Sequence, residues 1–189
     1  MPLSKATPQF RRQGAGFTLI ELMVTMVLLA VMLTLAAPSF ITFQRNAELT
    51  STANSFVAAL SAARSEAMKR QLDAYVIPAG GTQLWTNGWV VFVDTNNNQT
   101  YDSGTDLLIV QQDALPSTLT ASGMADGTDH YVRFSGSGFM SKLDGSFGLT
   151  NSIDFSNGGR TRRVIASPSG RFRVCDPVAD AVSCNTTTF

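Results

Sequence analysis

The order of apolar and polar positions divides the chain into three stretches. Residues 17–37 form an unbroken apolar run in which only Glu21 is charged. About 20 apolar residues are enough for a helix to cross a bilayer, so this run predicts a membrane-spanning helix. Basic residues before the run favour the cytoplasmic side and place the rest of the chain across the membrane; they are Lys5, Arg11 and Arg12.

An ordinary secretory signal is the alternative interpretation of the same run. Such signals have an apolar region of about 7–15 residues, which is shorter than residues 17–37. Their best cleavage point here, after Ala37, would leave Pro38 directly past the cut, which is unfavourable. The length of the run and this proline therefore favour a membrane helix.

The second stretch is amphipathic. Its apolar residues recur at steps of four and three, which is one stripe on a helix; they are Leu49, Ala53, Phe56, Leu60, Ala63 and Ala67. We expect this helix to cover residues 38–72, to end near Gln71 and to bend at Pro38. A single apolar face suits a helix that lies against a globular head.

The third stretch reads as short strands separated by turns rich in Gly, Asn, Asp and Ser. The predicted strands are 74–77, 89–94, 107–112, 131–135, 152–156, 161–167 and 171–175. The predicted fold class is α+β, with one long N-terminal helix, transmembrane and then amphipathic, packed on antiparallel β-sheet. The expected segments are a leader at 1–16, a transmembrane helix at 17–37, an amphipathic helix at 38–72 and a β-rich head at 73–189.

Glu21 requires an explanation, because a carboxylate inside an apolar span is costly and is by default functional. No cation lies near it in the sequence. If the chain were cut between Gly16 and Phe17, the new α-amine of a neighbouring subunit would supply the partner. Glu21 is therefore a candidate for subunit assembly.

The residues around this position resemble a known junction. Gly16-Phe17-Thr18-Leu19-Ile20-Glu21 is similar to the leader junction of type IV pilins and of type II secretion pseudopilins. The resemblance implies cleavage after Gly16 by prepilin peptidase, N-methylation of Phe17 and use of Glu21 in assembly. Pro38 matches the helix-kinking proline of these proteins. The resemblance also implies a single-pass bacterial inner-membrane protein with a periplasmic head that enters a filament with other major and minor pilins or pseudopilins.

Within that superfamily the head resembles the GspH/FimT group of minor subunits. The similarity rests on Ala62-Ala63-Arg64-Ser65-Glu66-Ala67, on the Trp-x-x-Gly-Trp strand that begins at Trp85, and on Ser169-Gly170-Arg171-Phe172-Arg173. It implies a minor pilin that initiates or caps a type IV pilus, or alternatively a GspH-like minor pseudopilin of a type II secretion system. We favour the pilus because the arginine-bearing strand and the cysteine-closed tail follow one another directly, as in FimT/FimU-like proteins.

The cysteines, Cys175 and Cys184, lie close together near the C-terminus. Export of this end favours a disulfide over two free thiols. Two cysteines at this spacing are too few for a metal site and do not form a CxxC redox motif.

Charge excludes a global basic field for nucleic acid, because 14 basic residues balance 14 acidic ones. A local patch is possible near the C-terminus, where the candidate residues are Arg160, Arg162, Arg163, Arg171 and Arg173. Strand alternation would place Arg171 and Arg173 on one face, with Phe172 and Val174 on the other. In the FimT branch this Gly-Arg-x-Arg motif is associated with binding of double-stranded DNA during uptake. The alternatives are a solvated strand face, or arginines paired with acids of a neighbouring subunit.

Other constellations favour structural roles. Residues 94–102 alternate oxygen ligands like a Ca²⁺ loop, but Gln99 stands where glycine is required and Thr105 where a bidentate Glu is required, so we favour a plain turn. Trp85 and Trp89 suit core packing better than ligand stacking. His130 is the only histidine, and no catalytic arrangement includes it. We therefore expect no enzyme, metal, cofactor or small-molecule substrate.

Overall fold

The computed structural model describes residues 16–126, 129–148 and 150–185. The chain separates into two compact units, residues 1–41 and residues 42–189, which are described in turn. The predicted leader lies outside the described residues except for Gly16.

The first unit contains the beginning of helix α1 (Leu19–Arg70). Thr18 caps this helix, because the Glu21 backbone N–H donates a 3.2 Å hydrogen bond to the Thr18 hydroxyl. By length and hydropathy, no single helix of the described residues meets the criteria for a membrane span. The stretches Leu19–Thr34 and Ser39–Arg70 meet them only together, as a bent pair. The interval between them contains Pro38.

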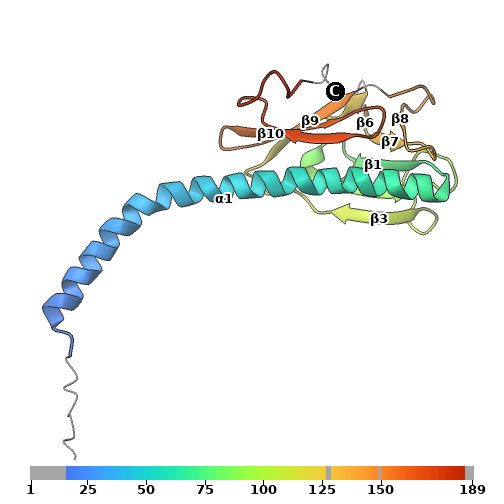
Figure 1. The fold of residues 1–189 in the computed structure, drawn as a ribbon. Coiled ribbons are helices and arrows are strands. Elements are labelled where there is room, and N and C mark those ends of the chain that lie inside the picture. The colour runs from blue at the N-terminus through green and yellow to red at the C-terminus, as the bar shows by residue number, and fades with distance from the viewer. Residues whose placement is uncertain (1–15, 127–128, 149, 186–189) are drawn as a thin grey trace, which may run out of the picture. The chain divides into compact units, whose positions relative to one another are not determined.

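The second unit is built from two antiparallel sheets and the rest of α1 (Figure 1). The first sheet has the order β3-β2-β1-β7-β8, and the second has the order β11-β10-β9-β4. First-sheet strands are β1 (Ala74–Pro78), β2 (Trp89–Val93), β3 (Leu107–Gln112), β7 (Val132–Phe134) and β8 (Met140–Ser141). Second-sheet strands are β4 (Thr120–Gly123), β9 (Asn151–Asn157), β10 (Arg160–Ala166) and β11 (Phe172–Cys175). A short hairpin joins β5 (Ala125–Asp126) and β6 (Asp129–His130), and single turns form η1 (Ala79–Gly81) and η2 (Trp85–Asn87).

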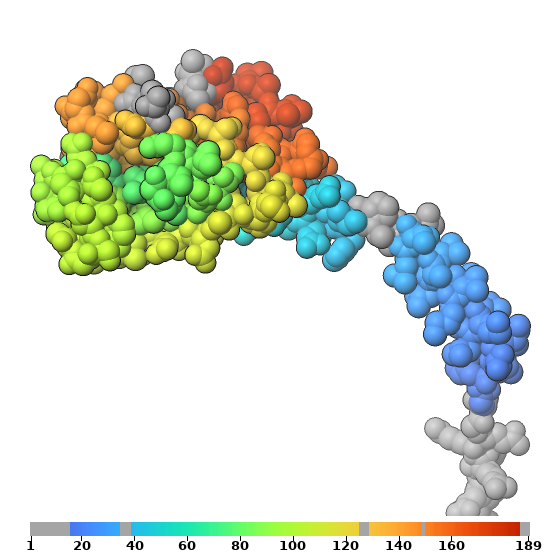
Figure 2. Space-filling model, turned by 180° about the vertical axis from the view of Figure 1, so that it is seen from behind, coloured from blue at the N-terminus to red at the C-terminus, as the bar shows by residue number. Residues whose placement is uncertain are grey.

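One core is shared by the helix and both sheets. The predicted helical stripe is confirmed, since Leu49, Phe56 and Leu60 are fully buried together with the three alanines of the stripe. Side chains of β1, β2 and β7 meet this stripe from the first sheet, and those of β9 and β10 meet it from the second. On the back of the head, the chain between β2 and β4 covers much of the surface, coloured lime green to yellow in Figure 2.

The predicted strands correspond to β1, β2, β3, β7, β9, β10 and β11, with ends that differ by at most one residue. Arg171 was expected in the last strand, but β11 begins at Phe172 because the tight turn before it still includes Gly170 at φ +74°. The helix ends at Arg70, one residue earlier than expected, because Gln71 adopts a left-handed φ of 57°. Four short strands, β4, β5, β6 and β8, were not predicted.

Candidate functional site

The predicted processing and assembly residues lie at the start of α1. Gly16 and Phe17 precede the helix, and Phe17 is 78% exposed. In the described part of the chain, no atom beyond its chain neighbours lies within 4 Å of the position that a Cβ on Gly16 would occupy. Glu21 follows in the first helical turn.

The sequence analysis missed the role of Thr18. Thr18-Leu19-Ile20-Glu21 fits the capping-box pattern, in which a Thr is followed three residues later by a Glu. The structure shows half of that box, the bond from the Glu21 N–H to the Thr18 hydroxyl. Glu21 is thus placed in the first helical turn, where the helix dipole favours a negative charge. It would be the fifth residue of the chain that begins at Phe17 after cleavage.

The Trp-x-x-Gly-Trp motif packs against the helix. Trp85 and Trp89 each place a ring edge-on to Phe56, at centroid distances of 5.2 and 5.1 Å. The Trp85 indole N–H also donates a 2.9 Å bond to the Gly123 carbonyl, which joins the motif to β4. Both indoles are 1% exposed, so the prediction of core packing is confirmed.

Arg64 connects two of the stretches that carry the family resemblance. Its Nε donates to the Gly138 carbonyl at 2.9 Å, and its Nη2 donates to the Ser169 carbonyl at 3.2 Å. A Cβ on Gly170 would collide with the Arg64 side chain. The helix motif therefore holds the turn that precedes the arginine-bearing strand, a link between distant segments that sequence reasoning missed.

The alternation expected around β11 is confirmed for Phe172, Arg173 and Val174, whereas Arg171 lies before the strand. Phe172 and Val174 pack against the core. Arg173 pairs in register with Ile165 of β10, and directly opposed residues of an antiparallel pair share a face. Arg173 therefore lies on the outer face of the second sheet. Arg171 is exposed beside the turn.

The other arginines are not all on that face. Arg163 lies on the outer face, where it forms a two-pronged pair with Asp154 at 2.6 and 2.7 Å, and this hydrogen bonding raises the pKa of Arg163. Arg162 lies on the opposite face and donates to Asp176 at 2.5 Å. Arg160 pairs in register with Asn157, whose amide reaches Glu48 of the helix, so Arg160 also lies on the helix side. The five arginines therefore divide between two faces.

The C-terminal loop is tied to the second sheet. Cys175 and Cys184 form the expected disulfide, with their Cα atoms 5.6 Å apart. The Cys184 carbonyl accepts a 3.3 Å bond from Arg163. Backbone N–H groups, that of Ala179 foremost, lower the pKa of Asp176, and the Arg162 guanidinium adds to this effect. The loop is thus held by a covalent bond and by two arginines.

The loop at 94–102 is organised by two carboxylates that bind its own backbone. Asp94 is 2% exposed and accepts the N–H of Asn98 at 3.3 Å and of Gln99 at 2.8 Å. Asp106 accepts the N–H of Thr95 at 3.0 Å and of Asp102 at 2.8 Å. These contacts are those of a hydrogen-bonded turn, the interpretation favoured from the sequence. Within the described ranges, no group of His, Cys, Asp and Glu is arranged to hold a metal ion.

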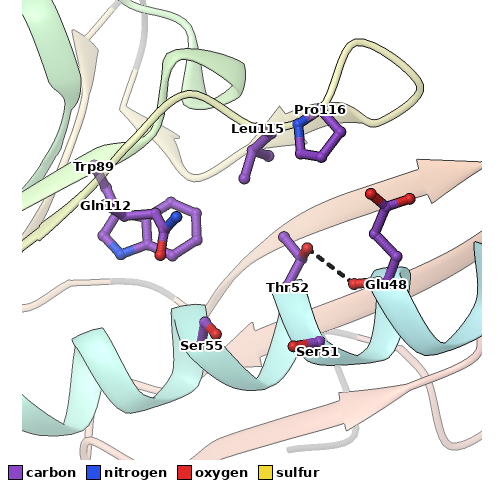
Figure 3. Close-up of a pocket in the computed structure, with 8 residues that line it drawn as sticks. All are labelled: Glu48, Ser51, Thr52, Ser55, Trp89, Gln112, Leu115 and Pro116. Atoms are coloured by element: carbon purple, nitrogen blue, oxygen red, sulfur yellow. Dashed lines mark hydrogen bonds between the residues drawn. The ribbon is translucent and has the colours of Figure 1, made fainter.

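A groove of about 310 Å³ lies between α1 and the chain after β3 (Figure 3). The helix contributes four polar side chains, and Trp89, Gln112, Leu115 and Pro116 face them; the helix residues are Glu48, Ser51, Thr52 and Ser55. The Thr52 hydroxyl donates to the Glu48 backbone carbonyl at 3.0 Å. With one carboxylate and no histidine in its lining, the groove offers contact surface and no nucleophile paired with a base.

An apolar helical start followed by an amphipathic helix packed on antiparallel sheet defines the class of type IV pilin-like subunits. Within this class the chain belongs to the GspH family. The family model described as type II transport protein GspH matches residues 52–170, and the model of the prokaryotic N-terminal methylation motif matches residues 11–37. The chain is accordingly a membrane-anchored minor pilin or pseudopilin, which is processed by prepilin peptidase and assembled with other pilins.

The proteins to which the chain is similar include one sequence relative and two solved structures. The chain is 30% identical over 171 residues to the pilin-like protein PilA1 of Thermus thermophilus, covering 84% of this chain and 97% of that protein. Its fold resembles the type IV minor pilin FimU of Pseudomonas aeruginosa, with a TM-score of 0.52, 19% identity and coverage of 70% and 92% of the two chains. The minor pseudopilin EpsH of the Vibrio cholerae type 2 secretion system matches with a TM-score of 0.49, 18% identity and coverage of 69% and 98%.

Proposed function

We propose that this chain is a minor pilin of a type IV pilus that helps to initiate or cap the filament from the inner membrane, with its head in the periplasm. The observation that carries the proposal is the start of α1. The Gly16–Phe17 bond precedes a capped helix whose apolar side chains are exposed, from Leu19 onward. Such a surface needs lipid or other helices to cover it. The pilin-like relative, which is matched over nearly its whole length, supports a pilus over a secretion system.

Processing and assembly are tested separately. Intact mass of the membrane-extracted protein should give a chain that begins at N-methylated Phe17, and a bulky residue in place of Gly16 should block the cut. Glu21→Gln should leave the protein inserted and folded but poorly incorporated into filaments, since the neighbour's α-amine loses its partner. Normal incorporation of Glu21→Gln would show that Glu21 serves only the helix cap.

Deletion of the gene distinguishes the two filament systems. A minor pilin of a type IV pilus should be needed for surface pili and dispensable for export of folded enzymes. If the deletion strain keeps its pili and loses secretion, the pseudopilin alternative is correct.

A second candidate function is weak binding of double-stranded DNA through Arg171 and Arg173. It is favoured by the exposure of Arg171, whereas Arg173 lies on the outer face with its Nε and Nη2 atoms buried and would have to reorient to reach phosphate. Planar guanidinium groups suit phosphate oxygens. Arg162 and Arg163 already form ion pairs with Asp176 and Asp154, so each would contribute little to DNA binding.

Gel shifts with the head, residues 42–189, test this candidate. Two to four phosphate contacts predict a slope of log affinity against log salt of roughly −2 to −4, with a dissociation constant of about 10⁻⁴ to 10⁻⁶ M. Arg171→Ala with Arg173→Ala should abolish the shift. If the double variant shifts DNA as well as the parent head does, the arginines have a structural role only.

A further inference from the structure

The tip of the β9–β10 hairpin lies against the helix at the start of the head. Gly158 and Gly159 form the two-residue turn, with φ of +58° and +83°. The neighbouring Asn157 is 5% exposed, and its amide donates a 2.9 Å bond to the Glu48 carboxylate. The Arg45 side chain lies over the turn, with Cδ and Nη1 each 3.2 Å from the position of a Cβ on Gly158. The hairpin tip and residues 45–48 therefore form one surface.

Two guanidinium groups share this surface. Arg160 lies on the helix side of the hairpin, as its register with Asn157 shows, and both Arg160 and Arg45 are exposed. In the described part of the chain, neither guanidinium group makes a hydrogen bond or an ion pair. The acids on this side are already engaged, Glu48 by Asn157 and Asp176 by Arg162. The hairpin tip thus presents two arginines whose positive charge is not locally neutralised.

The position of Arg45 along the chain indicates what these arginines face. Between Glu21 and Arg45 the sequence contains no charged residue. This run of 23 uncharged residues is longer than the about 20 residues that a helix needs to cross the hydrocarbon core of a bilayer. If Glu21 lies near one interface, Arg45 lies among the headgroups of the other. Exposed Phe40 and Phe43, at 65% and 70%, directly precede it.

We propose that Arg45 and Arg160 together bind the phosphate of an anionic phospholipid on the head's side of the membrane, before the subunit enters the filament. This inference rests on the proposed membrane-held subunit and adds a second membrane contact, made by the head. Two planar donors can share the oxygens of one phosphodiester while their aliphatic stems lie along the apolar boundary. The contact would orient the head over the bilayer and would be broken when the subunit is extracted.

Vesicle binding by the head measures the contact. Residues 42–189 contain the whole core, so this fragment keeps every contact of the second unit. At low salt it should sediment with vesicles of phosphatidylcholine mixed with phosphatidylglycerol and not with phosphatidylcholine alone. Each basic residue near an anionic surface is worth about fivefold in partitioning, so Arg45→Gln with Arg160→Gln should lose about thirtyfold. Lys69→Gln is the control for the loss of a positive charge and should bind like the parent, since Lys69 lies in the last turn of α1 and outside the hairpin tip.

Three results would overturn the proposal. They are absence of sedimentation with the anionic vesicles, equal sedimentation of the Arg45→Gln/Arg160→Gln variant, and competition by inorganic phosphate at the same phosphorus concentration. The last would identify a site for free phosphate instead of a lipid surface. Thermal unfolding of each variant confirms that the hairpin is intact.

The full chain in nanodiscs gives an independent readout. Hydrogen exchange of the amides at residues 157–160 should be slower in discs with phosphatidylglycerol than in phosphatidylcholine discs, and high salt should remove the difference. Equal exchange in the two lipids would contradict the proposal. Intact mass of the same preparation reports cleavage before Phe17, so a failure of the lipid contact is distinguishable from a failure of the pilin function.

Discussion

The two sheets share the helix on their inner faces but differ on their outer faces. The outer face of the first sheet is a second apolar layer in which Tyr75, Val90 and Phe92 are buried, with Tyr101 and Leu143 packed against them. The outer face of the second sheet is polar, with the Asp154–Arg163 pair at its centre and the disulfide loop tied to it. The first sheet is thus packed against apolar side chains on both sides, whereas the second has a mainly polar outer face that the disulfide loop adjoins and on which Ile165 is fully buried.

This difference separates positions that determine the fold from positions that are free to carry function. A residue between two apolar layers has little freedom, because a change of one methylene is felt in a close-packed core. A residue on a polar face is limited mainly by its charge partners. We therefore expect large effects of substitution near the first sheet and small effects for the charged side chains on the outer face of the second.

The largest effect should come from Gly88→Ala. Gly88 has φ +86°, and an added Cβ would meet the Gln112 carbonyl oxygen and lie 2.6 Å from that of Asp113. These are backbone atoms, so the turn between the two tryptophans and β3 must move apart. We expect a loss of at least about 3 kcal/mol of unfolding free energy, or no folded head at all.

Gly159→Ala is the matched control for that substitution. Gly159 has a similar φ of +83°, but apart from its chain neighbours no atom of the described residues lies within 4 Å of its Cβ position. The unfolding free energy of Gly159→Ala should fall only by the cost of an alanine in the left-handed conformation, about 1–2 kcal/mol. Urea unfolding of both variants measures the difference, and equal losses would show that φ, and not the contact with β3, explains the glycine of the motif.

The next effect concerns the disulfide loop. Replacing Cys175 and Cys184 by alanine should lower the unfolding free energy by about 2.5 kcal/mol, because the unfolded chain gains the freedom of a short closed loop. Hydrogen exchange should become faster in β11 and the loop, while β1 and β2 stay protected. Equal acceleration in β1 would contradict the independence of the two outer faces.

Much of the fold could be predicted because it depends on local periodicity. The buried stripe of α1 follows from steps of three and four, and β3 (Leu107–Gln112) was predicted with its observed ends. The strands that were missed are short and depend on distant partners. β4, for example, has the sequence Thr-Ala-Ser-Gly and is a strand only because it pairs with β9, about 30 residues later.

The candidate site was predicted less completely for the same reason. Spacing predicted the alternation of Arg171 and Phe172, but not which arginines share a face across the β9–β10 turn. That depends on the register of Arg160 with Asn157, set by the Gly158-Gly159 turn. The Arg64 link to Ser169 also could not be predicted, because it joins residues that are 105 positions apart.

A smaller effect on the unfolding free energy is expected from Tyr75, and only at alkaline pH. Tyr75 is 1% exposed and its hydroxyl has no partner among the described residues, and burial raises its pKa to about 12. Because the folded pKa lies above the unfolded value of about 10, the stabilisation is present below pH 10 and is lost as pH rises through 12. Between pH 9 and 11, the unfolding free energy of the parent head should fall by roughly 1 kcal/mol more than that of Tyr75→Phe. Identical pH profiles would show that the phenol is solvated.

The smallest effect should come from the Arg163–Asp154 pair on the outer face of the second sheet. The two side chains are 28% and 27% exposed, so water screens a contact that is geometrically good, with two bonds of 2.6 and 2.7 Å. A double-mutant cycle with Arg163→Gln and Asp154→Asn isolates their coupling from other effects of each change. We expect about 0.5–1 kcal/mol at low salt, and less at high salt, as for other partly exposed pairs. The i,i+4 pair of Arg70 with Glu66 on the helix provides the reference for an exposed contact. A coupling above about 2 kcal/mol that is insensitive to salt would mean that the outer face of the second sheet contributes to stability as strongly as that of the first. The arginines on this face would then mainly stabilise the fold, and few of them would be available to bind a partner.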